Sequence, residues 1–533
     1  MQPEFELEQY NKRLDALFSR FQSVQKVGFT GDAYKPGLGG MSRLSALLGD
    51  PWKAYPCIHV AGTNGKGSVC SMLAAALAAG GGVRTQADGQ CADRAPLAGH
   101  GRALCTARMA LWEDGPSSSR VGLYTSPHLL DFRERMKIVS GDGFEMITRE
   151  EVWEFLCLYE KEFDGLSFFE ITTGMAFWWF ARQGVDAAVI ETGLGGRLDS
   201  TNIIVPALSV ITSIGLDHCA LLGSTRAAIA REKAGIFKPG VPAVVGVRDA
   251  ETATVFEEVA ASVGAPLVFA SDVPACDEKD LLPRMDLTGP CQDLNLHTVL
   301  VALAILENSE GLGRIRPKAH QVAALEGGPG APEAENAPGG SPESGTWGEK
   351  GPKCTRSVLN AITEAGKRTG LWGRWQRICE KPEVICDIGH NPPALKENFA
   401  RLEALANGEG LASKQPRTVI IIYGIMADKD LAGIAPLMPA KAKYILAAPD
   451  NQRAMRAEEL AARLKALRPD LDCMVSERPA ASKAEAGRDG SVATAVRQAL
   501  DLAQDLPNAF IYIGGSTFVV AEALPLFNKT TEL

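Results

Sequence analysis

Residues 57–68 read CIHVAGTNGKGS, and this stretch decides the fold. Its first five residues are mostly apolar and of strand length, and residues 69–79 have the composition of a helix. Strand, glycine-rich loop and helix in this order are the setting of a phosphate-binding loop, where backbone N–H groups and a helix N-terminus face phosphate oxygens. The predicted loop comprises Gly62, Thr63, Asn64, Gly65, Lys66, Gly67 and Ser68.

Two side chains of this loop suit nucleotide chemistry. Lys66 provides a mobile cation for the outer phosphates of ATP, and the Ser68 hydroxyl can ligate Mg2+. One residue separates the lysine from the serine, whereas the two are adjacent in the usual P-loop. The alternative is a glycine-rich turn with an ordinary surface lysine, but the flanking strand and helix favour nucleotide binding. His59 lies in the strand and is interpreted as a core histidine.

Length and charge narrow the class of protein. The 533 residues, 46% of them hydrophobic, are enough for at least two cores. Lys and Arg number 55 against 64 Asp and Glu, so the net charge of −9 provides no general field for nucleic acid or an anionic membrane. No stretch reaches the roughly 18 apolar residues that a membrane span needs. We therefore expect a soluble monomer that binds neither nucleic acid nor membrane.

The cysteines and the first residues indicate the compartment. The 12 cysteines include no CxxC pair, and most lie in apolar surroundings, which favours reduced thiols. Residues 1–8 read MQPEFELE, an acidic start without an apolar run, unlike a secretory signal or a basic transit peptide. These features predict a cytoplasmic protein and leave a mitochondrial pool open.

Apolar runs of strand length alternate with helix-like stretches such as 69–79 and 226–234. This alternation predicts an α/β fold of mostly parallel sheets covered by helices. We expect a P-loop-type ATPase domain with a central sheet in residues 1–367 and a smaller, Rossmann-like α/β domain in residues 368–533. The predicted strands are 57–61, 187–191, 208–213, 243–247, 383–387, 418–423, 444–447 and 509–514.

Two segments interrupt this pattern, at about residues 83–121 and 327–353. The second is dominated by Pro, Gly, Ser and Glu, so we predict that it is disordered. The first is interpreted as a surface insertion, helical in part. It is either a lineage-specific loop or untrimmed non-coding sequence, and sequencing the mature transcript would decide between these alternatives.

Further sequence blocks follow the loop in a fixed order. They read YTSPHL at 124–129, SFFEITT at 167–173, ETGLGGRLDSTN at 191–202, DH at 217–218 and EKAGI at 232–236. Together with the loop, these blocks resemble the folate branch of the Mur ligase family, which comprises dihydrofolate synthase and folylpolyglutamate synthase. The resemblance covers nearly the whole chain apart from the two insertions, and the subgroup we expect is a fungal-like dihydrofolate synthase.

The resemblance implies an ATP-dependent ligase. A carboxylate attacks the γ-phosphate of ATP to give an acyl phosphate, and the amine of L-glutamate then displaces phosphate to form an amide. Such chemistry depends on positioning and on neutralising a crowded polyanion, which divalent cations do well.

The resemblance also implies two Mg2+ sites. One would use Ser68, Glu191 and ATP, and the other Ser126, Glu191 and His218. Lys233 is the family lysine that can be carbamylated into a carboxylate-like ligand. On the residues alone, Glu191 could be a structural carboxylate, His218 a packed turn residue and Lys233 a lysine that complements a helix C-terminus. The expected catalytic residues are Lys66, His218 and Lys233.

Later blocks supply the expected far side of the nucleotide site. A Gln–Asn pair of the family is matched at 292 and 295, and residues 372–374 match its Pro-Gly-Arg block with tryptophan in the place of proline. The Asn-Pro pair at 391–392, taken alone, could instead be a simple turn at the start of a helix. ATP would lie between the two domains, so domain closure is predicted. By resemblance, the ATP contacts from these blocks are Gln292, Asn295, Arg374, Asp387, His390 and Asn391.

Three features favour dihydropteroate as the acid. Glu170 stands where dihydropteroate-using relatives carry a carboxylate suited to the donor edge of a pterin, and residues 196–199 and 428–430 follow the same subgroup. Bacterial-type enzymes with both activities share all three features. A folylpolyglutamate synthase or a bifunctional enzyme acting on a reduced folate such as tetrahydrofolate therefore stays an alternative. The expected dihydropteroate-binding residues are Ser167, Phe168, Phe169, Glu170, Leu198, Asp199 and Ser200.

Three rival classes fit less well. A degenerate ligase acting as a nucleotide-binding regulatory protein would have lost metal ligands, yet all the expected ligands are present. A P-loop kinase or motor would have its lysine next to Ser or Thr, together with a nucleotide-switch region. A cell-wall Mur ligase is disfavoured by the blocks at 167–170 and 193–197.

Overall fold

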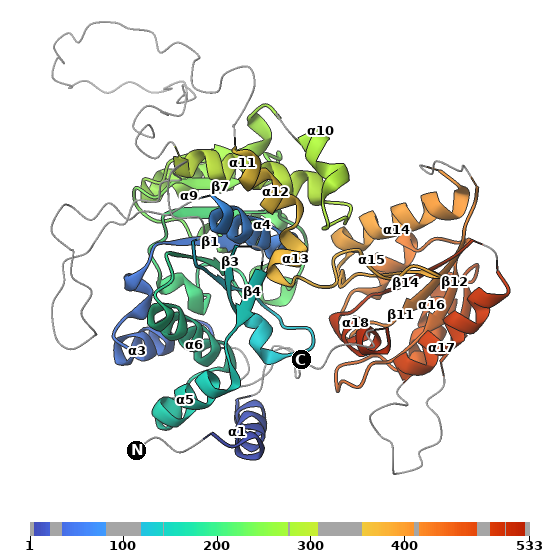
Figure 1. The fold of residues 1–533 in the computed structure, drawn as a ribbon. Coiled ribbons are helices and arrows are strands. Elements are labelled where there is room, and N and C mark those ends of the chain that lie inside the picture. Colours follow the sequence, from blue (N-terminus) through green and yellow to red (C-terminus); the bar gives the residue numbers. More distant parts are fainter. Residues whose placement is uncertain are drawn as a thin grey trace, which may run out of the picture.

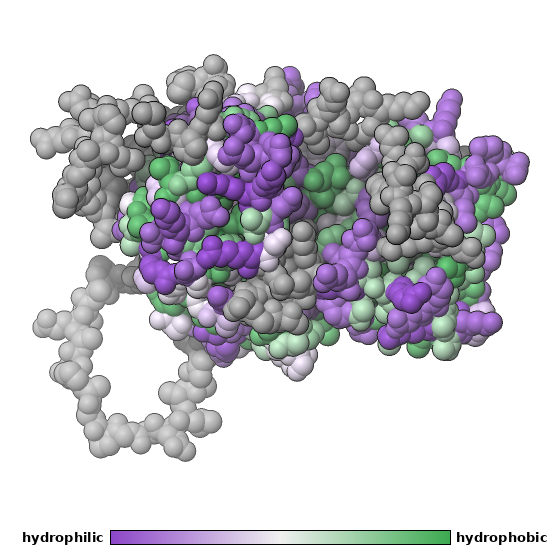
Figure 2. Space-filling model, turned by 90° about the horizontal axis from the view of Figure 1, so that it is seen from below, coloured by the Kyte–Doolittle hydropathy of each residue, from purple (hydrophilic) through white to green (hydrophobic). Residues whose placement is uncertain are grey.

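The structure, a computed structural model, describes residues 5–21, 35–80, 119–141, 143–275, 278–307, 354–409, 415–476, 491–506 and 508–527. Its elements form two sheets with helices packed on them, and the two halves lie side by side (Figure 1). Hydrophilic and hydrophobic residues are interspersed over the face seen in Figure 2. Within the described ranges, no helix is long and apolar enough to cross a membrane.

The first sheet has eight strands in the order β4-β3-β2-β5-β1-β6-β7-β8. They are β1 (Cys57–Ala61), β2 (Val121–Tyr124), β3 (Met136–Ser140), β4 (Gly143–Met146), β5 (Ala187–Glu191), β6 (Leu208–Ile211), β7 (Ala243–Val245) and β8 (Leu267–Phe269). β1 lies between β5 and β6 and is parallel to both, whereas β3 and β4 form an antiparallel hairpin at one edge. The carboxyl ends of the central parallel strands therefore meet at one edge of the sheet.

Helices cover both faces of the first sheet. Alternate residues of β5 belong to two different core clusters, one containing α4 and α11 and the other containing α6. These three helices are buried nearly all round, which explains their continuous apolar sequences. The helices of this half are α1 (Leu7–Arg20), α3 (Gly39–Leu47), α4 (Lys66–Ala79), α5 (Arg149–Tyr159), α6 (Phe168–Gln183), α7 (Cys219–Leu222), α8 (Arg226–Ala234), α9 (Ala253–Val263), α10 (Glu278–Leu281), α11 (Gln292–Glu307), α12 (Arg356–Thr363) and α13 (Ala365–Thr369).

The second sheet has six strands in the order β13-β12-β11-β14-β10-β9. All neighbours are parallel except β9, which pairs antiparallel with β10. One face packs on α14 and α16, and the other on α17 and α18. The elements are β9 (Gln376–Cys379), β10 (Glu383–Cys386), α14 (Pro392–Asn407), β11 (Thr418–Tyr423), α15 (Leu431–Ile434), β12 (Lys443–Leu446), α16 (Ala457–Leu467), β13 (Asp472–Val475), α17 (Ser491–Gln504), β14 (Ala509–Gly514) and α18 (Thr517–Ala523).

A short linker joins the two halves and is held at both ends. On the first half, Lys137 Nζ donates to the carbonyl oxygens of Thr369 (2.8 Å) and Gly370 (2.9 Å). On the second half, Gly373 N donates to Gln376 Oε1 (2.8 Å). Burial lowers the pKa of Lys137 to about 8.

The predicted fold class is confirmed, with an antiparallel strand pair at the edge of each sheet. Strands 57–61, 187–191, 418–423 and 509–514 and helix 226–234 have their predicted bounds. The other predicted strands differ by one or two residues at their ends, and α4 begins at Lys66 because the last loop residues form its first turn. The sequence did not predict the β3–β4 hairpin or the short strands β2, β8, β9 and β13. These are three to five residues long, several with exposed positions, so they lack a clear apolar run.

Some predictions fall on parts of the chain that the structure does not describe. These are the segment 327–353 and residues 83–118 of the insertion at 83–121. The predicted boundary between residues 367 and 368 falls within α13, a helix that contacts α4 of the first half.

Candidate functional site

The phosphate loop connects the end of β1 to the start of α4. Gly65 precedes the helix with a φ of +86°, and a Cβ atom there would run into Asn295 Oδ1. Lys66 Nζ donates to the carbonyl oxygens of Gly62 (3.1 Å) and Thr63 (3.3 Å), so its charge lies over the loop. The 14-residue helix α4 begins at this loop. Its N-terminal N–H groups and the Lys66 cation together suit the binding of phosphate.

Glu191, the last residue of β5, lies beside the loop with its side chain 5% exposed. Its Oε1 is 4.0 Å from Lys66 Nζ, and its Oε2 accepts a hydrogen bond from Ser126 N (3.2 Å). Burial raises the pKa of Glu191 above its ordinary value, although Lys66 and the Ser126 N–H oppose this shift. A buried carboxylate with so few donors suits a divalent cation, whose charge offsets the lost hydration.

Residues from distant elements complete the surroundings of the loop. Gln292 Nε2, on α11, donates to Ser68 Oγ (3.2 Å), and Asn295 Nδ2 donates to Gln292 Oε1 (3.0 Å). Arg374 Nη2 lies 3.1 Å from where a Cβ on Gly67 would be, so the glycine leaves room for the guanidinium group. The predicted Gln–Asn pair and Arg374 are thus brought to the loop.

Lys233 and His218 reach the same region by different routes. Lys233, on α8, is buried and donates to Gly62 O (2.8 Å). Burial and the nearby Lys66 lower the pKa of Lys233 to about 7. His218 precedes α7 with a φ of +53°. Burial lowers the pKa of His218 to about 3, so its imidazole is neutral at pH 7, which is the form that binds metals.

The described residues contain no group of three His, Cys, Asp or Glu side chains that could hold a metal ion. The predicted ligands instead combine one carboxylate, one imidazole, two hydroxyls and a lysine. The structure brings Glu191 to Ser126, but Lys233 bonds to the loop carbonyl and His218 bonds through its backbone to Asp217. Oxygen atoms of a nucleotide would be needed to complete a Mg2+ site here, and the buried Glu191 carboxylate fits such a site.

Asp387, directly after β10, is engaged by donors of the protein itself. Its Oδ2 accepts from Trp375 N (2.8 Å), and its Oδ1 accepts from Gly389 N (2.8 Å) and Asn398 Nδ2 (2.7 Å). Burial raises the pKa of Asp387, while the Gly389 N–H and Arg374 oppose this shift. These contacts organise the linker and the end of β10, and the contact of Asp387 with ATP stays a prediction.

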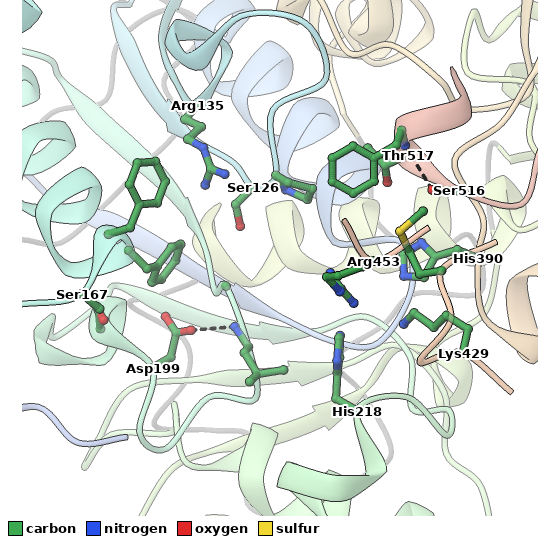
Figure 3. Close-up of a pocket in the computed structure, with 18 of the residues that line it drawn as sticks. Ser126, Arg135, Ser167, Asp199, His218, His390, Lys429, Arg453, Ser516 and Thr517 are labelled. Carbon is green, nitrogen blue, oxygen red and sulfur yellow. Dashed lines mark hydrogen bonds between the residues drawn. The ribbon is translucent and has the colours of Figure 1, made fainter. Parts of the chain in front are cut away.

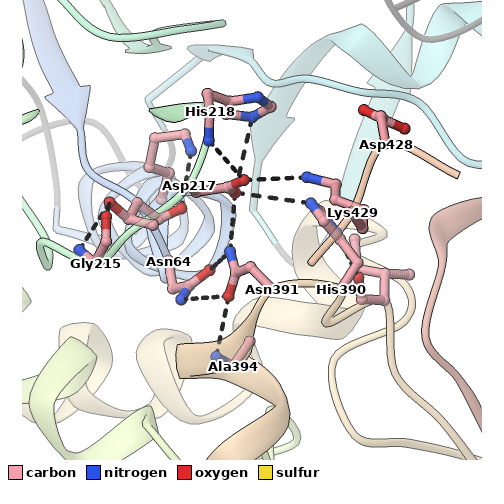
Figure 4. A network of polar contacts seen from close by, with 12 residues as sticks. Asn64, Gly215, Asp217, His218, His390, Asn391, Ala394, Asp428 and Lys429 are labelled. Carbon is pink, nitrogen blue, oxygen red and sulfur yellow. Dashed lines mark hydrogen bonds and ion pairs between the residues drawn. The ribbon is translucent and has the colours of Figure 1, made fainter. Parts of the chain in front are cut away.

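A polar network joins the two halves beside the loop (Figure 4). Asn391 exchanges two hydrogen bonds with Asn64 and donates a third to Asp217 Oδ2. Lys429 Nζ donates to Asp217 Oδ1 (3.1 Å), and His390 Nε2 lies 3.9 Å from Asp217 Oδ2. Burial opposes the ionisation of Asp217. His218, Lys429 and His390, together with the Asn391 donor, nevertheless hold the pKa of Asp217 below its ordinary value.

A cavity of about 230 Å³ opens next to this network and has walls from both halves (Figure 3). Ser126, His218 and His390 also line it, so it reaches the predicted metal and nucleotide residues. Of the residues predicted to bind dihydropteroate, those that line the cavity are Ser167, Phe168, Phe169, Leu198, Asp199 and Ser200.

Glu170 is the exception, because it does not line the cavity. Its Oε2 accepts hydrogen bonds from Ser167 N (2.7 Å) and Ser167 Oγ (2.8 Å), while Ser167 Oγ accepts from Glu170 N (3.2 Å). The pair forms a capping box at the start of α6, and Glu170 is 3% exposed. Its carboxylate therefore caps a helix and is not part of the cavity wall.

Asp199 is the carboxylate that lines the cavity. Its Oδ2 accepts from Leu194 N (2.7 Å), and its Oδ1 accepts from Thr201 N (3.0 Å) and Thr201 Oγ1 (2.5 Å). His59 Nε2 lies 2.8 Å from Thr201 Oγ1. Burial lowers the pKa of His59 to about 3, and the side chain is fully buried, as expected of a core histidine.

Sequence reasoning missed several charged and polar residues of the cavity. Arg135 is buried, its Nε donates to His128 Nδ1 (2.8 Å), and its guanidinium carbon lies 5.5 Å from the Phe168 ring centre. Arg453 and Ser516 line the opposite wall. Ser516 lies two residues after the end of β14, and the general rule that ligands bind at the carboxyl ends of parallel strands could have identified it.

Comparison with known proteins agrees with this architecture. The family described as "Mur ligase, glutamate ligase domain" matches residues 373–517. The probable bifunctional folylpolyglutamate synthase/dihydropteroate synthase of Haloferax volcanii is 29% identical over 497 residues, or 92% of this chain. The chain spans 48% of that protein, and its match to the Bacillus subtilis dihydrofolate synthase/folylpolyglutamate synthase, 36% identical, spans 50% of the latter.

Solved structures share the fold. Mycobacterium tuberculosis folylpolyglutamate synthase complexed with ADP has a TM-score of 0.65 at 23% identity, with 99% of this chain and 100% of that chain covered. Among sequences, the dihydrofolate synthase/folylpolyglutamate synthase of Escherichia coli is 30% identical over 437 residues. Because that match covers 80% of this chain and 80% of the Escherichia coli protein, the chain belongs to the dihydrofolate synthase/folylpolyglutamate synthase family.

Proposed function

We propose that this protein is an ATP-dependent ligase that joins dihydropteroate to L-glutamate, the activity of a dihydrofolate synthase. The observation that carries the proposal is the position of Ser126. Its N–H donates to Glu191 beside the phosphate loop, and the same residue lines the cavity. The loop and the cavity are therefore adjacent, as the transfer of a phosphoryl group from nucleotide to acid requires.

In the proposed reaction, a carboxylate oxygen of the acid attacks the γ-phosphorus of ATP, and ADP leaves. The amine nitrogen of L-glutamate then attacks the acyl carbon, phosphate leaves, and the nitrogen loses a proton to complete the amide. Lys66 and Arg374 neutralise the transferring group, because Lys66 is the first residue of α4 and the Arg374 guanidinium group lies next to Gly67. Phe168 and Phe169 pack on the ring system of the acid, and Asp199 accepts hydrogen bonds from its donor edge.

Relatives support the proposal that this chain binds a nucleotide, a divalent cation and glutamate. A bifunctional folylpolyglutamate synthase/dihydrofolate synthase with Mn, AMPPNP and L-Glutamate bound is 25% identical, with a TM-score of 0.62. We propose that Ser68 and Glu191 hold one Mg2+ with ATP, and that Ser126, Glu191 and His218 hold a second. A bound cation would offset the negative charge that faces the attacking carboxylate. Carbamylated Lys233 would add a ligand, since its amine is buried beside the loop.

The proposal assigns nucleotide binding to residues 1–367 and glutamate ligation to residues 368–533, in a cytoplasmic monomer. Addition of glutamate to a reduced folate is the second candidate activity. It is favoured by the Escherichia coli relative, which is named for both dihydrofolate synthase and folylpolyglutamate synthase.

A single assay tests the substrate. Purified protein with ATP, Mg2+ and L-glutamate is offered dihydropteroate or tetrahydrofolate in separate reactions, and ADP and the amide product are measured. We expect turnover with dihydropteroate. Turnover with tetrahydrofolate alone would replace the preferred acid by the second candidate, and the absence of ADP formation with both acids would contradict a ligase of either kind.

A further inference from the structure

Asn391 precedes α14, and its side chain faces the first half (Figure 4). Its Oδ1 accepts hydrogen bonds from Ala394 N (3.0 Å) and from Asn64 Nδ2 (3.1 Å). Its Nδ2 donates to Asn64 Oδ1 (3.0 Å) and to Asp217 Oδ2 (3.0 Å). An amide side chain offers two acceptor lone pairs and two donor hydrogens, so these four bonds use its whole capacity.

These partners indicate a role for Asn391 other than the predicted contact with ATP. The residue is 2% exposed, and its amide has no remaining donor or acceptor position for a nucleotide. The reciprocal pair with Asn64 instead connects the start of α14 to the phosphate loop, because Asn64 is a loop residue.

Asn64 is fixed to the first sheet through its backbone. Its carbonyl oxygen accepts from Thr212 Oγ1 (2.6 Å) and Ser213 Oγ (3.1 Å), the two residues that follow β6. Its N–H points to Ser213 Oγ (3.3 Å). The backbone of Asn64 is thus held by one half and its side chain by the other, so a displacement of the second half acts directly on the loop.

A second tie lies next to the first. Asp217 accepts from Lys429 Nζ (3.1 Å) with one oxygen and from Asn391 Nδ2 with the other. The Lys429 and Asp217 side chains are 14% and 12% exposed, so salt screens their attraction less than it screens a surface pair. One carboxylate of the first half therefore gathers two contacts from the second half. We call the four residues Asn64, Asp217, Asn391 and Lys429 the latch.

We propose that Asn391 is a positioning residue of the ligase reaction, holding the phosphate loop through Asn64 and acting together with the Asp217–Lys429 pair. This proposal rests on the proposed function, which assigns the loop to ATP. In the structure the second half is docked on the loop through Asn391, and residues of both halves line the cavity. Phosphoryl transfer is thereby coupled to a closed cavity, where a reactive acyl phosphate is kept from water.

The variant Asn391→Asp separates the latch from the helix cap. Aspartate caps α14 as well as asparagine does, but it lacks the two donor hydrogens and places a second carboxylate against Asp217. We expect kcat to fall about 10- to 100-fold, with a smaller change in the KM for the acid. Small-angle X-ray scattering with Mg2+ and ADP should show a more extended particle than the unmodified protein.

A matched control removes a pair outside the latch. Lys443→Met breaks an ion pair with Asp472 on the second half, and these side chains are 45% and 68% exposed. Such a surface pair contributes little, so this variant should match the unmodified protein in both kcat and scattering.

A double-mutant cycle gives a second, independent readout. Asn391→Ser keeps an uncharged cap, and Asn64→Ala removes the other partner of the amide pair. Since the two residues share their bonds, the double variant should lose about as much activity as the more damaged single variant. Strictly additive losses of activity in the double variant would overturn the proposed role of the latch. Unchanged kcat and scattering in Asn391→Asp would overturn it as well. If the unmodified protein ligates no glutamate, the proposed function fails, and the scattering comparison still decides whether Asn391 holds the halves together.

Discussion

Each half of the molecule has a buried acid at the end of a strand, and the surroundings of the two acids differ. Asp387, after β10, accepts hydrogen bonds from two backbone N–H groups and one amide side chain. Glu191, at the end of β5, accepts one from Ser126 N within the described part of the chain, with Lys66 Nζ at 4.0 Å. Burial raises the pKa of both. The oxygens of Asp387 are satisfied by donors that organise the second half, whereas those of Glu191 have few donors and are available to a ligand.

The sharpest way to break this comparison is Glu191→Gln. The amide keeps the shape of the side chain but cannot offset the charge of a cation, so we expect kcat to fall at least about 1,000-fold. The midpoint of thermal unfolding should stay the same or rise, because a buried charge with few donors has been removed. Phosphate release and a thermal melt measure the two effects, with the exposed Glu145→Gln as the control. Near-normal turnover would refute the metal-binding role of Glu191.

Asp387→Asn is predicted to have the opposite signature in stability. An amide nitrogen would face at least one of the donors that now point at the carboxylate, leaving that donor buried without an acceptor. We expect the free energy of unfolding to fall by about 2–4 kcal/mol. Urea denaturation measures this loss, and an unchanged midpoint would show that the contacts of Asp387 do not support the second half.

Lys137 extends the comparison to a buried cation with two acceptors. Its pKa is lowered by burial from 10.5 to about 8 in the folded protein, so between these values the unfolded chain binds more protons. The contribution of Lys137 to stability is therefore lost as pH falls through about 8 and is fully present above 10.5. As pH rises from about 8 to 10.5, the free energy of unfolding should increase by about 1–3 kcal/mol more in the unmodified protein than in Lys137→Met. Parallel denaturation curves at several pH values test this, and a difference that does not vary with pH would contradict it.

The sequence predicts those parts of the site that are local in the chain. The phosphate loop is contiguous with β1 and α4, so its strand, glycines and helix could be identified together. The Ser-x-x-Glu pattern at 167–170 is also local and predicts a capping box. The structure has this capping box, and the substrate role that family resemblance gave to Glu170 stays a prediction.

Other parts of the site depend on strand order, which no local pattern encodes. β1 lies between β5 and β6, and β2 is next to β5, so residues after four separate strands meet at one edge of the sheet. Glu191, Ser126 and His218 were therefore predicted from resemblance alone. The Asp217–Lys429 pair spans 212 positions of the chain and both halves. Arg135 and Arg453 were missed for the same reason, because their place in the cavity depends on tertiary structure.

The anchored linker has a mechanical consequence. Lys137 holds the chain at Gly370 and the carbonyl of Gly366 holds Leu371, while the second half holds the chain again from Gly373, so only Trp372 lies between the two anchors. The φ and ψ angles of so short a link allow a swing about one pivot but leave no slack for sliding. Trp372, 38% exposed, sits on that pivot. A smaller and more flexible residue there, such as glycine, would alter how quickly the two halves part while leaving both sheets as they are.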